Sequence, residues 1–189
     1  MTQPTTAEIK NALRRELTER RNLGSLQNEV ARDFTANLIQ LAREQKANCL
    51  ACYLSYGSEP ETDGFLKWAL ENSIRVMLPV AHDDGEMTWV YFDGQSTKSS
   101  IYGFAEAIGE PANLVDAELI LVPALAADTA GNRLGKGKGY YDRALDASIF
   151  APTYAVVYET EVLAEIASEP HDRKIDGIVT DARIIKIQN

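Results

Sequence analysis

The spacing of apolar residues predicts two amphipathic helices at the start of the chain. Thr5 and Glu8 have the spacing of a capping box, and apolar positions then recur every four residues, which predicts a helix from about residue 6 to residue 21. A second series at helical spacing predicts a helix that ends near Gln45. That series is Val30, Phe34, Leu38 and Leu41.

Short apolar runs in the remainder of the chain predict strands that alternate with short helices. The predicted strands are residues 49–55, 75–80, 87–92, 118–123, 155–158 and 177–179. The predicted helices are residues 65–71, 140–145 and 161–167. The run 118–123 is almost wholly apolar, which is typical of a strand covered on both faces. Because strands and helices alternate, we expect one α/β domain over residues 1–189 with a mainly parallel sheet.

The acidic balance of the chain argues against several classes of partner. The formal net charge at pH 7 is -9 and the sequence pI is about 4.8. Such a chain repels nucleic-acid phosphates and anionic lipid, so we expect neither nucleic-acid nor membrane partners, and an anionic ligand requires a local basic site. The amino terminus lacks the apolar segment of a secretory signal, so we expect a cytoplasmic protein.

The two cysteines, Cys49 and Cys52, have a C-x-x-C spacing that is also found in redox and metal sites. They lie inside a predicted buried strand, where positions three apart point to opposite faces. A redox pair of this spacing normally opens a helix, and only His82 and His171 could complete a metal site. We therefore interpret both cysteines as core residues.

A glycine-rich loop between the strand 118–123 and the next helix is the candidate ligand site. Glycine occupies alternate positions from Gly135 to Gly139, with Lys136 and Lys138 between them. Glycine allows backbone N–H groups to approach phosphate oxygens closely, and the lysines add charge. The pattern matches neither the Walker A loop nor the dinucleotide fingerprint. A solvated connection explains the loop equally well, but its place at the carboxyl end of a buried strand favours ligand binding.

Four segments of the chain together resemble the 5-formyltetrahydrofolate cyclo-ligase family. The longest is LILVPALAADTAGNRLGKGKGYYDRAL at residues 119–145; the others are Lys10 with Arg14, YGSEPET at 56–62, and HDRKIDGIVTD at 171–181. One segment departs from the family pattern Gly-x-x-Glu-Pro, because Glu106 is followed by Ala107. The resemblance implies a three-layer α/β/α fold with a mainly parallel sheet, related in topology to sugar-phosphate isomerases and CoA transferases.

The resemblance also implies an ATP- and Mg²⁺-dependent enzyme that cyclises 5-formyltetrahydrofolate, and it assigns roles to particular residues. The residues expected to bind ATP are Lys10, Arg14, Arg133, Leu134, Gly135, Lys136, Gly137, Lys138, Gly139, Tyr140 and Tyr141. Those expected at the folate are Tyr56, Glu61, Lys136 and Tyr140, and those expected to be catalytic are Glu61, Lys138 and Tyr140. Asp142 and Asp176 are expected to bind Mg²⁺, a hard cation that takes few carboxylates together with phosphate oxygens.

Two other functions are compatible with the same loop and fold. A sugar-phosphate isomerase-like enzyme would use the anion site without ATP, and a nucleotide-binding module would bind without turnover. The combination of Asp142, Asp176 and Glu61 argues against both, because neither function requires all three carboxylates. We expect the folate, a small molecule, as the partner and a monomeric protein.

Overall fold

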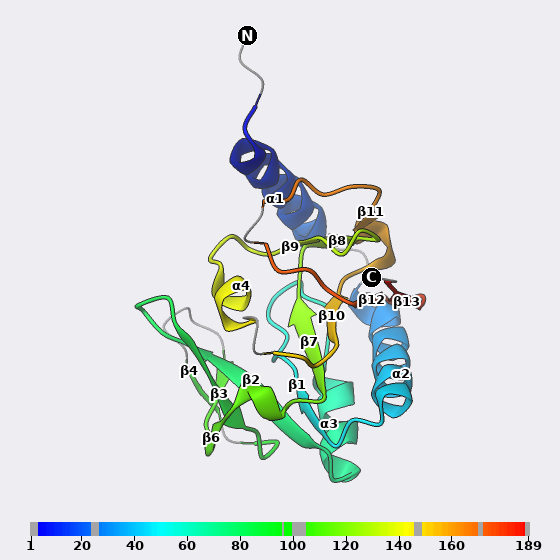
Figure 1. Cartoon of the computed structure of the whole chain (residues 1–189). Helices are drawn as coiled ribbons and strands as arrows, with labels where there is room; N and C mark the ends of the chain where they lie inside the picture. Colours follow the sequence, from blue (N-terminus) through cyan, green and yellow to red (C-terminus); the bar gives the residue numbers. More distant parts are fainter. Residues whose placement is uncertain are drawn as a thin grey trace.

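The computed structural model describes residues 4–23, 27–95, 97–99, 105–145, 149–169 and 172–187 (Figure 1). Its helices are α1 (Thr6–Asn22), α2 (Gln27–Gln45), α3 (Asp63–Glu71) and α4 (Tyr140–Ala144), with short 3-10 turns at Leu114–Asp116 and Glu159–Glu161. Three features named in the sequence analysis lie outside the described residues. They are the side chain of Val30, His171, and the first two residues of the Gly-x-x-Glu segment that ends at Glu106. Among the residues described, none of the helices combines the length and apolar character needed to cross a bilayer.

A central eight-stranded sheet organises the molecule, with strand order β13-β12-β10-β7-β1-β2-β3-β6. The strands β12, β10, β7, β1 and β2 are parallel, and β13, β3 and β6 are antiparallel to their neighbours. Their bounds are β1 Cys49–Ala51, β2 Arg75–Ala81, β3 Met87–Tyr91, β6 Pro111–Ala112, β7 Leu119–Pro123, β10 Thr153–Val156, β12 Gly177–Val179 and β13 Ile184–Lys186. The mainly parallel sheet predicted from the sequence is confirmed.

Two small sheets flank the central one. The first has the order β11-β8-β9, formed by Val162–Leu163, Ala126–Asp128 and Arg133–Leu134. The second pairs β4 (Thr97–Ser99) with β5 (Ala105–Ala107). The first leads into the glycine-rich loop, and β5 lies against β2.

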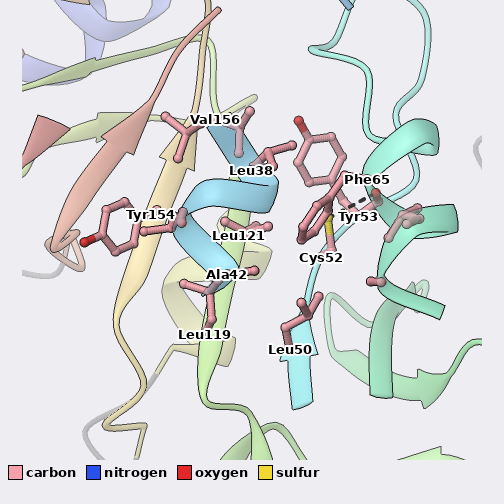
Figure 2. Packing of buried hydrophobic residues seen from close by; sticks show 14 of the residues in the cluster. Leu38, Ala42, Leu50, Cys52, Tyr53, Phe65, Leu119, Leu121, Tyr154 and Val156 are labelled. Carbon is pink, nitrogen blue, oxygen red and sulfur yellow. Dashed lines mark hydrogen bonds between the residues drawn. The ribbon is translucent and has the colours of Figure 1, made fainter. Parts of the chain in front are cut away.

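The core lies on both faces of the central sheet, as the apolar pattern predicts. Alternate residues of β7 enter different clusters: Leu119 and Leu121 pack with α2 and α3, whereas Ile120 and Val122 pack on the α4 side. Figure 2 shows the first cluster, with Leu38 and Ala42 of α2 lying over the face of the sheet formed by β10, β7 and β1. Since α2 and α3 cover one face and α4 lies on the other (Figure 1), the fold has helical layers on both sides of the sheet.

The cysteines and the first helix cap behave as the sequence predicts. Cys49 packs into the cluster on the α4 side and Cys52 into the cluster under α2 and α3, and both are free thiols. Burial raises the pKa of Cys52 to about 12. At the start of α1, Glu8 N donates to Thr5 Oγ1 at 3.3 Å and Thr5 N donates to Glu8 Oε2 at 2.8 Å. The capping box and the interpretation of the cysteines as core residues are therefore confirmed.

One predicted element is wrong, because residues 161–167 do not form a helix. Glu161 ends a 3-10 turn, and β11 follows and pairs with β8. The Ile166 N–H donates to the buried carboxylate of Asp128 at 2.8 Å rather than to a helical carbonyl. The segment therefore pairs with β8 and donates to Asp128 instead of forming a helix, because these tertiary interactions override its local helical preference.

Candidate functional site

A cavity of about 530 Å³ opens at the carboxyl ends of β1 and β7. It is lined by residues of the loop 133–142, of α1, of the segment after β1, and of β2, β3 and β5. Its volume lies in the range of small-molecule sites, and its position is where open parallel sheets bind ligands. The cavity therefore coincides with the loop selected from the sequence.

Two glycines of the loop hold backbone conformations that other residues rarely adopt. Gly137 has φ +90° and Gly139, which precedes the first residue of α4, has φ +69°. A Cβ at Gly137 would lie 3.4 Å from the Arg14 guanidinium, whose Nε donates to the Gly135 carbonyl at 2.9 Å. Arg14 thus packs along the loop and fixes its path from α1.

Lys10, one turn before Arg14 on α1, is buried and lines the cavity. Its ammonium group forms ion pairs with Glu169 at 3.2 Å and with Asp172. Both carboxylates also line the cavity. The ammonium group of Lys10 is therefore already paired with carboxylates of the protein. To bind a phosphate, it must exchange a carboxylate partner for a phosphate oxygen.

Lys136 lines the cavity and contacts the loop after β1. Its ammonium lies 2.6 Å from Glu59 Oε1 and 6.0 Å from the centroid of the Tyr56 ring. Glu59 also accepts a hydrogen bond from the Tyr56 backbone N–H at 3.0 Å. The predicted residues Tyr56 and Lys136 are thus brought together, and Glu59 joins them.

Glu61 lies apart from this group. It is exposed and is not among the residues that line the cavity, whereas Glu59 lines it and is mostly buried. The next residue, Thr62, is buried and donates its hydroxyl to the Tyr53 carbonyl at 2.7 Å, which fixes the chain beside Glu61. The acidic residue that reaches the cavity is therefore two positions earlier than expected, and the predicted role of Glu61 stays a prediction.

Apolar residues of the sheet also line the cavity, among them Leu78, Pro79 and Met87. Glu106, on β5, adds a carboxylate to this lining although only 4% of the residue is exposed. Its Oε1 accepts a hydrogen bond from the Ala81 backbone N–H at 3.0 Å. Sequence reasoning missed Glu106 and Glu59 as site residues. A signal for Glu106 was present, because it occupies the glutamate position of the family pattern Gly-x-x-Glu-Pro although Ala107 replaces the proline.

Tyr140 and Tyr141 both line the cavity at the start of α4. The Tyr140 hydroxyl donates to the His82 carbonyl at 2.9 Å. Tyr141 contacts Trp89 edge to face, with ring centroids 6.4 Å apart. Burial, with the negative charge of Glu59 nearby, raises the pKa of Tyr141 well above its ordinary value, so its phenol stays protonated at neutral pH.

The two predicted metal ligands occupy different positions. Asp142 lines the cavity, and its Oδ1 lies 2.6 Å from Arg133 Nη2. Asp176 is not among the lining residues; its Oδ2 accepts the Thr153 N–H at 2.9 Å, at the amino end of β10. No group of three or more metal-ligating side chains occurs in the part of the chain that is described. Asp142 is placed to hold a magnesium ion that also binds phosphates, and the predicted role of Asp176 as a metal ligand stays a prediction.

Comparisons with known proteins agree with the geometry. The sequence profile of the 5-formyltetrahydrofolate cyclo-ligase family matches residues 6–181. A 5-formyltetrahydrofolate cyclo-ligase of Mycolicibacterium smegmatis is 38% identical over 149 residues, which cover 71% of this chain and 74% of that protein. The mouse enzyme of the same name is 26% identical, with 93% of this chain and 95% of the mouse protein covered.

Solved structures are similar over nearly the whole chain. A 5,10-methenyltetrahydrofolate synthetase of Aquifex aeolicus superposes with a TM-score of 0.83 at 25% identity, covering 96% of this chain and 94% of the other. One from Mycoplasma pneumoniae superposes with a TM-score of 0.71 at 22% identity, covering 91% of this chain and 98% of the other, which supports the fold.

Proposed function

Because this chain belongs to the 5-formyltetrahydrofolate cyclo-ligase family, we propose that it converts 5-formyltetrahydrofolate to 5,10-methenyltetrahydrofolate with ATP, releasing ADP and phosphate. One observation supports the proposal most directly: the same cavity is lined by the glycine- and lysine-rich loop and by apolar residues of the sheet. Such a cavity accommodates a triphosphate and a heterocyclic ring side by side, as a phosphoryl transfer between them requires.

The loop 133–141 fits the triphosphate. Its conformation depends on glycines at positive φ, and a side chain at Gly137 would be strained there. Lys136 and Lys138 both line the cavity and supply positive charge next to the backbone N–H groups. Helix α4 has only five residues, so its dipole contributes little and the loop itself provides the anion site.

The residues of the chain act by positioning and by charge stabilisation. ATP supplies a phosphoryl group that converts the formyl oxygen into a leaving group; the N10 nitrogen can then close the ring as phosphate departs. Lys136 and Lys138 stabilise the charge that develops on the transferred group, and Tyr140, tied to the sheet through the His82 carbonyl, confines the reacting groups. We retain Lys138 and Tyr140 as catalytic residues, because both line the cavity.

Asp142 would hold the magnesium ion in this scheme. Its carboxylate is at the cavity, next to the loop that would bind the phosphates. In the free protein Arg133 neutralises Asp142, so magnesium and Arg133 compete for the same oxygen. The ion would then supply positive charge that offsets the charge of the phosphates.

A direct assay tests the proposal. The purified protein is mixed with 5-formyltetrahydrofolate, ATP and Mg²⁺, and the absorbance of the methenyl product is followed together with ADP. We expect one ADP per methenyl product, and no product when ATP is omitted. ATP binding without product would indicate a nucleotide-binding module, and conversion of sugar phosphates without ATP would indicate an isomerase.

A further inference from the structure

Glu106 is a buried carboxylate of the cavity, at a distance in sequence from the glycine-rich loop. It lies on β5, and only 4% of the residue is exposed although it lines the cavity. Within the described part of the chain, its one hydrogen bond is from the Ala81 N–H to Oε1, at 3.0 Å. A carboxylate has about four lone-pair positions. Acceptor capacity is therefore left on a buried group that faces a ligand cavity.

The other acidic groups of the cavity form ion pairs, whereas Glu106, although Lys98 stands opposite it in the β4–β5 pair, forms none within the described residues. Glu59 pairs with Lys136, and Asp142 pairs with Arg133. Among the ion pairs of the described residues, none includes Glu106. Removing an unpaired carboxylate from water is costly unless hydrogen-bond donors compensate. In the free protein one backbone N–H does so, and a ligand that brings further donors would bind here preferentially.

The surroundings restrict what such a ligand can be. Apolar residues that line the same cavity include Pro79 and Met87, which suit a flat, weakly polar ring. A ring that presents two adjacent N–H donors and no acceptor on one edge fits a carboxylate best, because a carboxylate only accepts. The adenine of ATP has no such edge, since its amino group lies beside acceptor nitrogens.

We propose that Glu106 recognises the 2-amino-4-oxopyrimidine edge of the pterin ring, accepting hydrogen bonds from the ring N3–H and the 2-amino group. This inference rests on the proposed function, which supplies the pterin. It makes Glu106 a specificity-determining residue for the folate, beside the end of β2, where the Tyr140 hydroxyl donates to the His82 carbonyl. It also gives the pterin a carboxylate partner within the cavity, where Glu61 does not lie.

The variant Glu106→Gln tests the proposal by changing one acceptor into a donor. Gln keeps the size of the side chain and an oxygen that can accept from Ala81 N, so we expect the circular dichroism spectrum and melting temperature of the parent. Glu110→Gln is the matched control, because Glu110 is exposed and lies four positions away in the same segment. Dissociation constants are measured without ATP for 5-formyltetrahydrofolate and for its analogue with oxygen in place of the 2-amino group.

We expect the variant to change the ratio of the two dissociation constants, in favour of the 2-oxo analogue. Glu106→Gln should weaken binding of 5-formyltetrahydrofolate by roughly ten- to a hundredfold, the range for a hydrogen bond to a charged group. The 2-oxo analogue should lose far less, because its oxygen can accept from the Gln amide, so the ratio of the two constants should change by about tenfold or more. ATP affinity and the Glu110→Gln control should stay within about twofold of the parent.

Each other outcome decides a separate question. Equal weakening of both folates, with an unchanged ratio, would mean that Glu106 only supports the cavity wall, and the proposal would be overturned. A loss of nucleotide affinity instead of folate affinity would assign the carboxylate to the nucleotide and overturn it as well. If the parent protein bound neither folate, the proposed function itself would fail, independently of the variant.

Discussion

The buried ion pair between Arg21 and Glu161 offers a quantitative test of how α1 is attached to the sheet. The Arg21 and Glu161 side chains are 4% and 1% exposed, and two hydrogen bonds join them at 2.7 and 2.6 Å. Arg21 also donates to the Ala124 carbonyl at 2.7 Å, and Ala124 lines the cavity. Glu161 further accepts the Tyr158 N–H at 3.0 Å. The pair therefore connects the first helix, the end of β7 and the turn after β10.

Removal of one partner leaves the other charged group buried without compensation, which costs about 3–5 kcal/mol. Both Glu161→Gln and Arg21→Met should show a loss of this size. For a chain of this length about 1 kcal/mol lowers the melting temperature by roughly 2–4 °C, so each variant should melt roughly 6–20 °C lower. The double variant buries no unpaired charge and should lose well under the sum, with a coupling free energy of about 2 kcal/mol or more.

Urea and thermal unfolding of the four proteins in this cycle provide the measurement. Glu71→Gln is the control, because Glu71 lies 4.0 Å from Lys67 in an exposed i,i+4 pair whose side chains are 78% and 63% exposed. That change should cost less than about 0.5 kcal/mol. If Glu161→Gln were no more destabilising than Glu71→Gln, or if the two buried single effects simply added, the reasoning from burial would be refuted.

Three further predictions concern the loop, the thiols and the metal. Gly137→Ala should weaken ATP binding by about tenfold or more because of the positive φ, with an unchanged circular dichroism spectrum, whereas Gly135→Ala, where φ is not positive, avoids this strain and should weaken ATP binding less. Because burial raises the pKa of Cys52 to about 12, an alkylating reagent at pH 8 should leave Cys52 unmodified in the native protein and modify it only after unfolding. Asp142→Asn should raise the Mg²⁺ concentration needed for turnover; if Asp176→Asn does so equally, Asp176 reaches the metal in the ligand-bound protein.

The features that follow from local sequence were predicted well. The alternation of Leu119 to Val122 between two apolar clusters needs only the two-residue period of a strand and a continuous apolar run. The capping box of Thr5 and Glu8 depends on residues three positions apart. The position of the loop after β7 follows from the order of the elements, because ligands of parallel sheets bind at the carboxyl ends of the strands.

Features that depend on distant partners were not predictable in the same way. Residues 161–167 have a helical apolar spacing, yet Val162 pairs with Ala127 on β8 and the Ile166 N–H donates to Asp128. The same limit applies to Glu59 and Glu61, which are two positions apart in one loop. Which of them reaches the cavity depends on Lys136, which lies more than seventy positions away in the sequence.

The free site is balanced electrically although it is proposed to bind a triphosphate. Three basic side chains of the cavity each have an acidic partner: Lys10 with Glu169 and Asp172, Lys136 with Glu59, and Arg133 with Asp142. On a chain of net charge -9, these pairs keep the cations of the cavity compensated while no anion is bound. Phosphate binding would therefore exchange carboxylate partners for phosphate oxygens and would leave Asp142 without its cation. A divalent cation that enters with the phosphates restores this balance at Asp142, which gives a physical reason why nucleotide and magnesium would bind together.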